Sequence, residues 1–173
     1  MPAGLKQSSS LITIGFDVTE TGANTFTQAR VDLQLNPLDN EVFVVQAINM
    51  DALAPDVNPG LNSATNASFT TTSKTGIANL SDTNCMATVK DDIRTDVALA
   101  AVSAGVAFSR TSMETPPSGL EYIGIISTND FFVQVAGGNN LLAQGVSGKI
   151  YGFRARAESS IYSALVQGEV LSA

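Results

Sequence analysis

The stretch that most constrains the fold is Glu41 to Met50, EVFVVQAINM. β-branched and aromatic residues fill most of it, and such residues favour strands. Pro and Asn precede the run at Asn36-Pro37, and Pro55 follows it; such residues commonly bound strands. We expect two alternating faces, one with Val42, Val44, Gln46 and Ile48 and the other with Phe43, Val45, Ala47 and Asn49. Both sets are apolar up to Val45, so both faces of the strand need cover. We therefore predict a central strand with the rest of the chain packed around it.

Several other stretches have the period-two alternation of a strand with one buried face. In residues 25–35, Ala29, Val31 and Leu33 alternate with Gln28, Arg30 and Asp32. Residues 11–18 show the same period, and we predict that these two stretches pair as antiparallel neighbours. The remaining predicted strands cover residues 69–74, with the character of an edge strand, and residues 120–126, 131–136 and 149–157.

Two segments carry a helical signal. Acidic residues at Asp91 and Asp92 suit a helix N-terminus, so we predict a short helix near 91–101 followed by a strand ending near Ser109. The segment 159–171 fits either a helix capped by Ser159 or a last strand, and the sequence leaves both open.

Together these elements predict an all-β fold, a single β-sandwich or jelly roll of about eight antiparallel strands with one or two short helices. Only 14% of the residues are charged, against about 25% in typical proteins, and much of the polar surface is Ser, Thr and Asn. No alternation of strands with helices is present, which disfavours a doubly wound sheet. We expect residues 1–10 to form an extended arm and residues 11–173 to form one sandwich domain.

The chain lacks the residues that most enzymes use. It has no His, which removes the usual general base and the commonest metal ligand. Its one cysteine, Cys85, cannot form an intrachain disulfide. Asp92 and Asp96 would lie one turn apart on the predicted helix and could share a calcium ion, although solvated acids at a helix N-terminus explain them better. We expect neither an enzyme nor a cofactor.

Charge bears on the partners. The net charge is −7, with nine Lys and Arg in 173 residues, and tight nucleic-acid binding requires a basic surface. We therefore expect no strong nucleic-acid binding by this chain alone. The longest weakly charged apolar stretch, residues 97–108, is too short for the roughly 20 residues that span a bilayer, and the first ten residues have no signal-peptide core.

Function is therefore expected at the loops and termini. Loops 51–66 and 110–120 are long enough to contact neighbouring subunits. Arg154 and Arg156 share one strand face, where they would contact either a neighbouring subunit or nearby acids of the same chain. The predicted subunit contacts are Lys6, Gln7, Ser8, Asp56, Asn58, Arg154 and Arg156.

Two stretches carry a resemblance to known proteins. YIGIISTNDFFVQVAGGNN (122–140) and KIYGFRARAESSIYSALVQGEVLS (149–172) resemble small viral coat proteins, in particular structural proteins of uncultured marine viruses. The resemblance implies a self-assembling major capsid subunit of a virion shell, built in the host cytoplasm from copies of itself and other virion proteins. It transfers no catalytic residues, and this chain departs from many coat proteins in lacking a basic arm. Two alternatives stay open: a filament, sheath or pilus-type surface subunit, and a carbohydrate-binding β-sandwich module.

Overall fold

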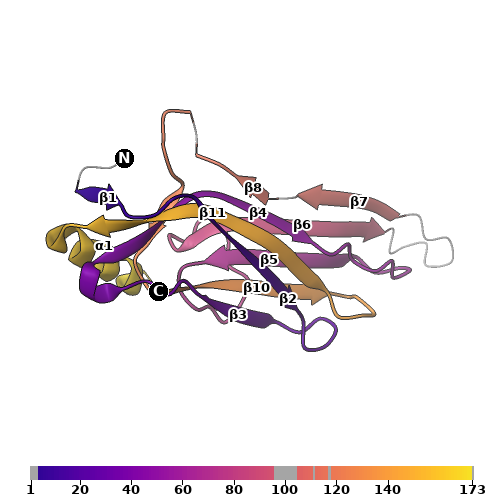
Figure 1. Ribbon diagram of the computed structural model, residues 1–173. Helices are drawn as coiled ribbons and strands as arrows, with labels where there is room; N and C mark the ends of the chain where they lie inside the picture. The colour runs from indigo at the N-terminus through magenta and orange to yellow at the C-terminus, as the bar shows by residue number, and fades with distance from the viewer. Residues whose placement is uncertain (1–3, 96–104, 111, 117, 173) are drawn as a thin grey trace.

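The computed structural model describes residues 4–95, 105–110, 112–116 and 118–172, which form strands and one C-terminal helix (Figure 1). Every strand pairing is antiparallel, so the all-β prediction is confirmed. The elements are β1 (Leu5–Gln7), β2 (Ile12–Thr19), β3 (Thr27–Asp32), a 3-10 turn (Pro37–Asp39), β4 (Glu41–Ala52), β5 (Ser63–Thr70), β6 (Cys85–Thr95), β7 (Gly105–Arg110), β8 (Ser112–Glu114), β9 (Gly124–Ile126), β10 (Asp130–Gly138), β11 (Gly145–Ala157) and α1 (Ser159–Leu171).

The strands form two sheets. In the first, β4 pairs with β11 on one side and with β8 and β9 on the other, while β1 and β2 pair with the far edge of β11. The second sheet has the order β3-β10-β5-β6-β7. The chain changes sheet at each connection from β2 to β5, and again from β7 to β8 and from β9 to β11. This is the connectivity of a jelly roll.

The topology corrects two predictions. The stretches around β2 and β3 do not pair with each other, because β2 pairs with β11 and β3 pairs with β10 in the opposite sheet. Their buried residues face each other across the sandwich instead. The strand predicted at 69–74 begins at Ser63, and it lies between β10 and β6 as an inner strand of its sheet rather than an edge.

The main core lies between the two sheets. Three phenylalanines from different strands meet at its centre: Phe69 and Phe131 stack with ring centroids 4.6 Å apart, and Phe16 lies 6.1 Å from each. Each ring adds a large apolar area to the buried surface, and the pairs add a smaller geometric preference. This cluster ties β2 of the first sheet to β5 and β10 of the second.

The central strand β4 is covered on both sides, as predicted, but its alternation is interrupted. Tyr151 of β11 lies opposite Ala47, and the next residue of β11 lies opposite Val45, so Gln46 is an extra residue in β4. Phe43 and Val45 face the main core before this β-bulge, and Ile48 faces it afterwards. A bulge of one residue exchanges the two faces of a strand. The uninterrupted alternation expected along 41–50 is therefore wrong beyond Val45.

Helix α1 covers one end of the first sheet. Its apolar residues pack on the outer face of β4 and β11, over Val42, Val44 and Phe153, and form a second core. Of the two readings left open for 159–171, the helix is correct, but its N-cap residue is Glu158 rather than Ser159. The helix predicted near 91–101 is wrong where it is described, because residues 91–95 belong to β6 and pair with β5 and β7; its remainder lies outside the described residues.

Candidate functional site

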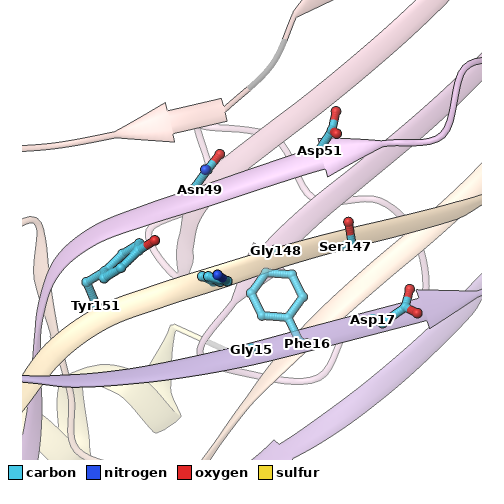
Figure 2. A pocket seen from close by; sticks show the side chains of 9 residues that line it. Gly15, Phe16, Asp17, Asn49, Asp51, Ser147, Gly148 and Tyr151 are labelled. Carbon is cyan, nitrogen blue, oxygen red and sulfur yellow. The ribbon is translucent and has the colours of Figure 1, made fainter.

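The outer face of the first sheet is divided into a covered end and an open end. Helix α1 and β1 cover Val42, Val44 and the C-terminal half of β11. Beyond the bulge, the outward-facing residues of β2, β4 and β11 are exposed or half-buried, and Figure 2 shows them on three neighbouring strands. We call this region the open face; its outward-facing residues are Gly15, Asp17, Asn49, Asp51, Ser147, Lys149 and Tyr151, and the inward-facing Phe16 and Gly148 complete the lining of a depression there.

Strand register arranges the open face in rows. Ser147 lies between Asp17 on β2 and Asp51 on β4, and Lys149 lies in the next outward-facing row. Two carboxylates, a hydroxyl and an ammonium group thus border a shallow depression of about 570 Å³. These side chains can exchange hydrogen bonds with a polar ligand, since carboxylates accept and the ammonium group donates.

Tyr151 forms the border between the covered and the open end. Its neighbours along the outer face are Phe153, which packs in the second core, and Lys149, which is exposed. The sequence places Tyr151, Phe153, Ala155 and Ala157 on one apolar face, and these residues do share a face of β11. That face lies outside the sandwich, so its last member at the open end lines the depression.

A buried carboxylate organises the loops at one end of the sandwich. Glu20, only 4% exposed, accepts hydrogen bonds from the backbone N–H groups of Asn24, Gly137 and Gln144 at 3.3, 2.6 and 2.8 Å. Asn140 adds a reciprocal pair of bonds with Asn24. The β2–β3 and β10–β11 connections are therefore held together by hydrogen bonds between backbone groups and the side chains of Glu20 and Asn24. No motif in the sequence predicts this role of Glu20.

Asp56 and Asn58, predicted as subunit contacts, belong to the same group of loops. Asp56 accepts hydrogen bonds from the backbone N–H groups of Leu141 and Leu142 at 2.9 and 2.8 Å, and Asn58 donates to the carbonyl of Asn139 at 3.2 Å. These contacts join the β4–β5 loop to the β10–β11 loop. We call these two loops, residues 53–62 and 139–144, the loop end.

The loop end presents large apolar side chains to solvent. Leu141 and Leu142 are 66% and 68% exposed, and the β4–β5 loop adds three more. The two loops are joined by hydrogen bonds, so these side chains gather at one end of the molecule. The exposed apolar residues of the loop end are Leu53, Val57, Leu61, Leu141 and Leu142.

The predicted arm lies along its own chain. Residues 5–7 form β1, in which Lys6 is paired with Arg156 and Gln7 with Ala155. The Ser8 hydroxyl donates to Glu41 at 3.4 Å, and the Ser8 backbone N–H donates to the carbonyl of Arg154 at 2.8 Å. The side chains of Lys6, Gln7 and Ser8 stay exposed, so they remain available to a neighbour.

Arg154 and Arg156 contact acids of their own chain. Arg154 lies 4.0 Å from Glu41 and donates to the carbonyl of Leu33 at 3.0 Å, while Arg156 lies 3.3 Å from Asp39. The second of the two sequence readings, pairing with nearby acids, is thus present in the structure. A contact with another subunit stays a prediction.

No metal site is visible in the described part of the chain. No three His, Cys, Asp or Glu residues come together there. Asp92 lies on a strand, where it pairs with Lys90 at 3.2 Å and Arg94 at 3.5 Å. Asp96 lies outside the described residues, so the shared calcium site stays a prediction without its helix.

Cys85 lines a hollow of about 460 Å³ between α1, β6 and β9. Burial raises the pKa of its thiol to about 11. Since the thiolate is the reactive form, this cysteine is protected from chemistry at neutral pH. Among the described helices, none is long and apolar enough to cross a bilayer.

Comparison with known proteins finds no match in sequence and only a weak match in structure. No protein-family model matches the chain, and no curated protein matches it. One solved chain, titled Desmodium yellow mottle tymovirus, aligns over 92% of this chain and 96% of that chain, with 8% sequence identity and a TM-score of 0.29. A TM-score this low does not bear on function, which has to be argued from the geometry.

Proposed function

We propose that this protein is a self-assembling structural subunit, and that the assembly is a virion shell of which it is the major capsid protein. The observation that carries the proposal is a jelly roll whose loop end exposes five large apolar side chains. Soluble monomers rarely expose apolar residues in large groups, and such groups commonly mark interaction sites.

The fold narrows the choice of function. Jelly rolls serve mainly as viral capsid domains, lectins and cupins. The chain has no His, and His is the commonest metal ligand in proteins. This disfavours a cupin that binds a metal through imidazole. A wall-forming subunit instead needs a rigid sandwich with contact surfaces at its ends. The loop end and the exposed arm side chains supply such surfaces.

The pairing of the basic residues supports a capsid in which the genome is packaged by something other than the cations of this chain. Within the described part of the chain, seven of the nine Lys and Arg residues lie within 4.0 Å of a carboxylate. These residues are Arg30, Lys74, Lys90, Arg94, Arg110, Arg154 and Arg156. Local pairing leaves little free positive charge for a phosphate backbone.

The test is assembly of the purified full chain, followed by electron microscopy and light scattering over a range of salt and pH. We expect closed particles of uniform size. Filaments would select the alternative of a sheath or pilus-type subunit, and monodisperse monomer under every condition would overturn the proposal.

A pair of variants locates the contact. Leu141→Asp with Leu142→Asp places charge on the loop end, and we expect it to abolish assembly while the circular dichroism spectrum is unchanged. Leu38→Asp is the matched control, since Leu38 is 92% exposed on the 3-10 turn beside α1, at the opposite end of the sandwich (Figure 1). Equal loss of assembly in both variants would argue against the loop end as the contact.

A second candidate function is favoured by one observation. Tyr151 borders a depression that also holds Asp17, Asn49 and Asp51 (Figure 2). An aromatic ring beside hydrogen-bonding groups suits a sugar, which has an apolar face and many hydroxyls. A glycan array would test this reading, with Tyr151→Ala as the matched variant. Binding at micromolar concentration that the variant loses would establish a carbohydrate-binding module.

A further inference from the structure

We propose that β7 pairs with β7 of a second copy, so that the second sheet continues from one subunit into the next. The proposal rests on the proposed self-assembly and adds to it one specific contact with a defined register. Strand β7 (Gly105–Arg110) lies at the edge of its sheet and pairs only with β6 among the described residues. Figure 1 shows it at the margin of the molecule.

The other sheet edges carry features that discourage pairing. An open edge presents unpaired N–H and C=O groups, and natural proteins protect such edges with charges, prolines or short strands. Strand β3 carries Arg30 and Asp32, β2 carries Asp17, β1 carries Lys6, and β8 and β9 have three residues each. In β7 the only charge is Arg110, at its last position.

Strand β7 is also apolar where a partner would lie. All six residues are exposed, with Val106 at 60% and Phe108 at 57%. Phe108 lines a hollow of about 320 Å³ together with Ile77 and Ala78. An apolar strip therefore runs from the loop before β6 across Phe108 to the free edge, which is where a second strand would bury it.

Symmetry limits how two copies can pair. A twofold axis perpendicular to the sheet places residue i opposite residue j and residue j opposite residue i. The axis then passes midway between one residue of β7 and the same residue of the second copy. Centring it on Ala107 places Val106 opposite Phe108 of the second copy, twice. Apolar cross-strand pairs of this kind stabilise antiparallel sheets.

Side-chain pairing and charge favour this register over the one centred on Phe108. Within one subunit Val106 lies beside Arg94, Phe108 beside Asp92, and Arg110 beside Lys90. With the axis at Ala107, each row across the joined sheets begins with Arg94 and ends with the second copy's Asp92. With the axis at Phe108, Val106 would face Arg110 of the second copy. The row would then run from Arg94 through Val106 to the second copy's Arg110 and Lys90, and would hold three cations. That register also places Val106 opposite a charged side chain and loses both Val106–Phe108 pairs, which weakens the pairing.

The pairing alone is small. Stable dimers bury about 800 Å² per partner, more than six residues of one strand supply. We therefore expect it to be weak between isolated subunits and to act together with other contacts in the assembly. A covalent trap detects such a contact better than a measurement of dimer mass.

The experiment is disulfide trapping of the full chain. In the proposed register the two Ala107 Cα atoms lie about 4.5–5.5 Å apart, within the range for a disulfide. Ala107→Cys should give several-fold more disulfide-linked dimer under mild oxidation than the unmodified protein, whose buried Cys85 serves as the baseline. Ser109→Cys is the matched control. In this register Ser109 lies opposite Gly105 of the second copy and about 13 Å from Ser109 of the second copy, so this variant should form no excess dimer.

The outcomes separate this inference from the proposed function. No excess dimer with Ala107→Cys in concentrated or assembled protein would overturn the pairing, and a dominant dimer with Phe108→Cys would overturn the register. Particles that form without the cross-link would leave the capsid function in place and refute the β7 contact. Cross-linked dimers without any larger assembly would support the β7 contact and refute the capsid function.

Discussion

Glu169 offers a test of how the helix is fixed to the sandwich. Its carboxylate is 8% exposed and accepts four hydrogen bonds from the turn between β9 and β10. The donors are the backbone N–H and hydroxyl of Ser127, at 2.9 and 2.6 Å, and the same two groups of Thr128, at 3.2 and 2.9 Å. This one side chain therefore joins the C-terminal end of α1 to the main sandwich.

The magnitude follows from the donors that Glu169→Ala would leave without an acceptor. A buried donor without a partner costs about 1–3 kcal/mol. The two hydroxyls can rotate to other acceptors, but the two backbone N–H groups cannot. The hollow beside α1 admits water, which offsets part of the cost. We expect a loss of about 3 kcal/mol in the free energy of unfolding, or a fall in Tm of about 6–12 °C for a chain of this length.

The assay is urea unfolding followed by circular dichroism, with binding of an apolar dye as a second readout. Loss of the contact should loosen α1 and expose the second core to the dye before the sandwich unfolds. Glu169→Gln keeps one acceptor oxygen, so its loss of stability should be smaller. Glu158→Ala is the matched control, since Glu158 is an exposed acid at the other end of α1 whose side chain makes no capping bond. Stability of Glu169→Ala within about 0.5 kcal/mol of the unmodified protein would refute the reasoning.

Three further predictions concern packing and titration. Gly148→Ala should lower the free energy of unfolding by about 1–3 kcal/mol, because its Cβ would collide with the carbonyl of Asn49 and the ring of Phe16, whereas Gly138→Ala meets no atom within 4 Å and should be neutral; urea unfolding of both variants measures the difference. Cys85 should resist alkylation at pH 8 in the folded protein, as followed by mass spectrometry, and rapid labelling would contradict its burial. Lys74 lowers the pKa of Asp82 below the ordinary 3.8, so this pair should stabilise the fold at neutral pH and lose that contribution as the pH falls through the lowered pKa; Asp82→Asn should therefore differ from the unmodified protein at pH 7 and converge with it in acid.

The sequence predicted the fold class because local pattern and burial agree along most of the chain. In β2 and β3 the alternating apolar residues are the ones that turn inward. Alternation identifies a buried face but not the strand that will lie beside it. This is why β2 and β3 were assigned to one sheet although they belong to two. Sheet assignment depends on contacts between distant residues, such as Phe16 with Phe131.

Other features were hidden for local reasons. Residues 91–95 have acids and a spacing that suit a helix, yet the backbone pairing with β5 and β7 makes them a strand. Tertiary pairing commonly overrides weak propensity of this kind. The bulge at Gln46 has no distinctive sequence signature, and neither does the role of Glu20, whose partners are backbone groups far along the chain.

The bulge at Gln46 links the fold to the candidate surfaces. It lets β4 contribute Val42 and Val44 to the core beneath α1, and then Ile48 and Met50 to the core between the sheets. Because β4 supplies apolar residues to both cores in this way, its outer face beyond the bulge can carry the polar residues Asn49 and Asp51. A continuous alternation would have turned Ile48 and Met50 outward, where only a further covering element could bury them. The open face therefore follows from a single extra residue, and deletion of Gln46 should preserve the sandwich, because Val45 and Ala47 would then lie opposite consecutive residues of β11 with Ile48 and Met50 still turned inward.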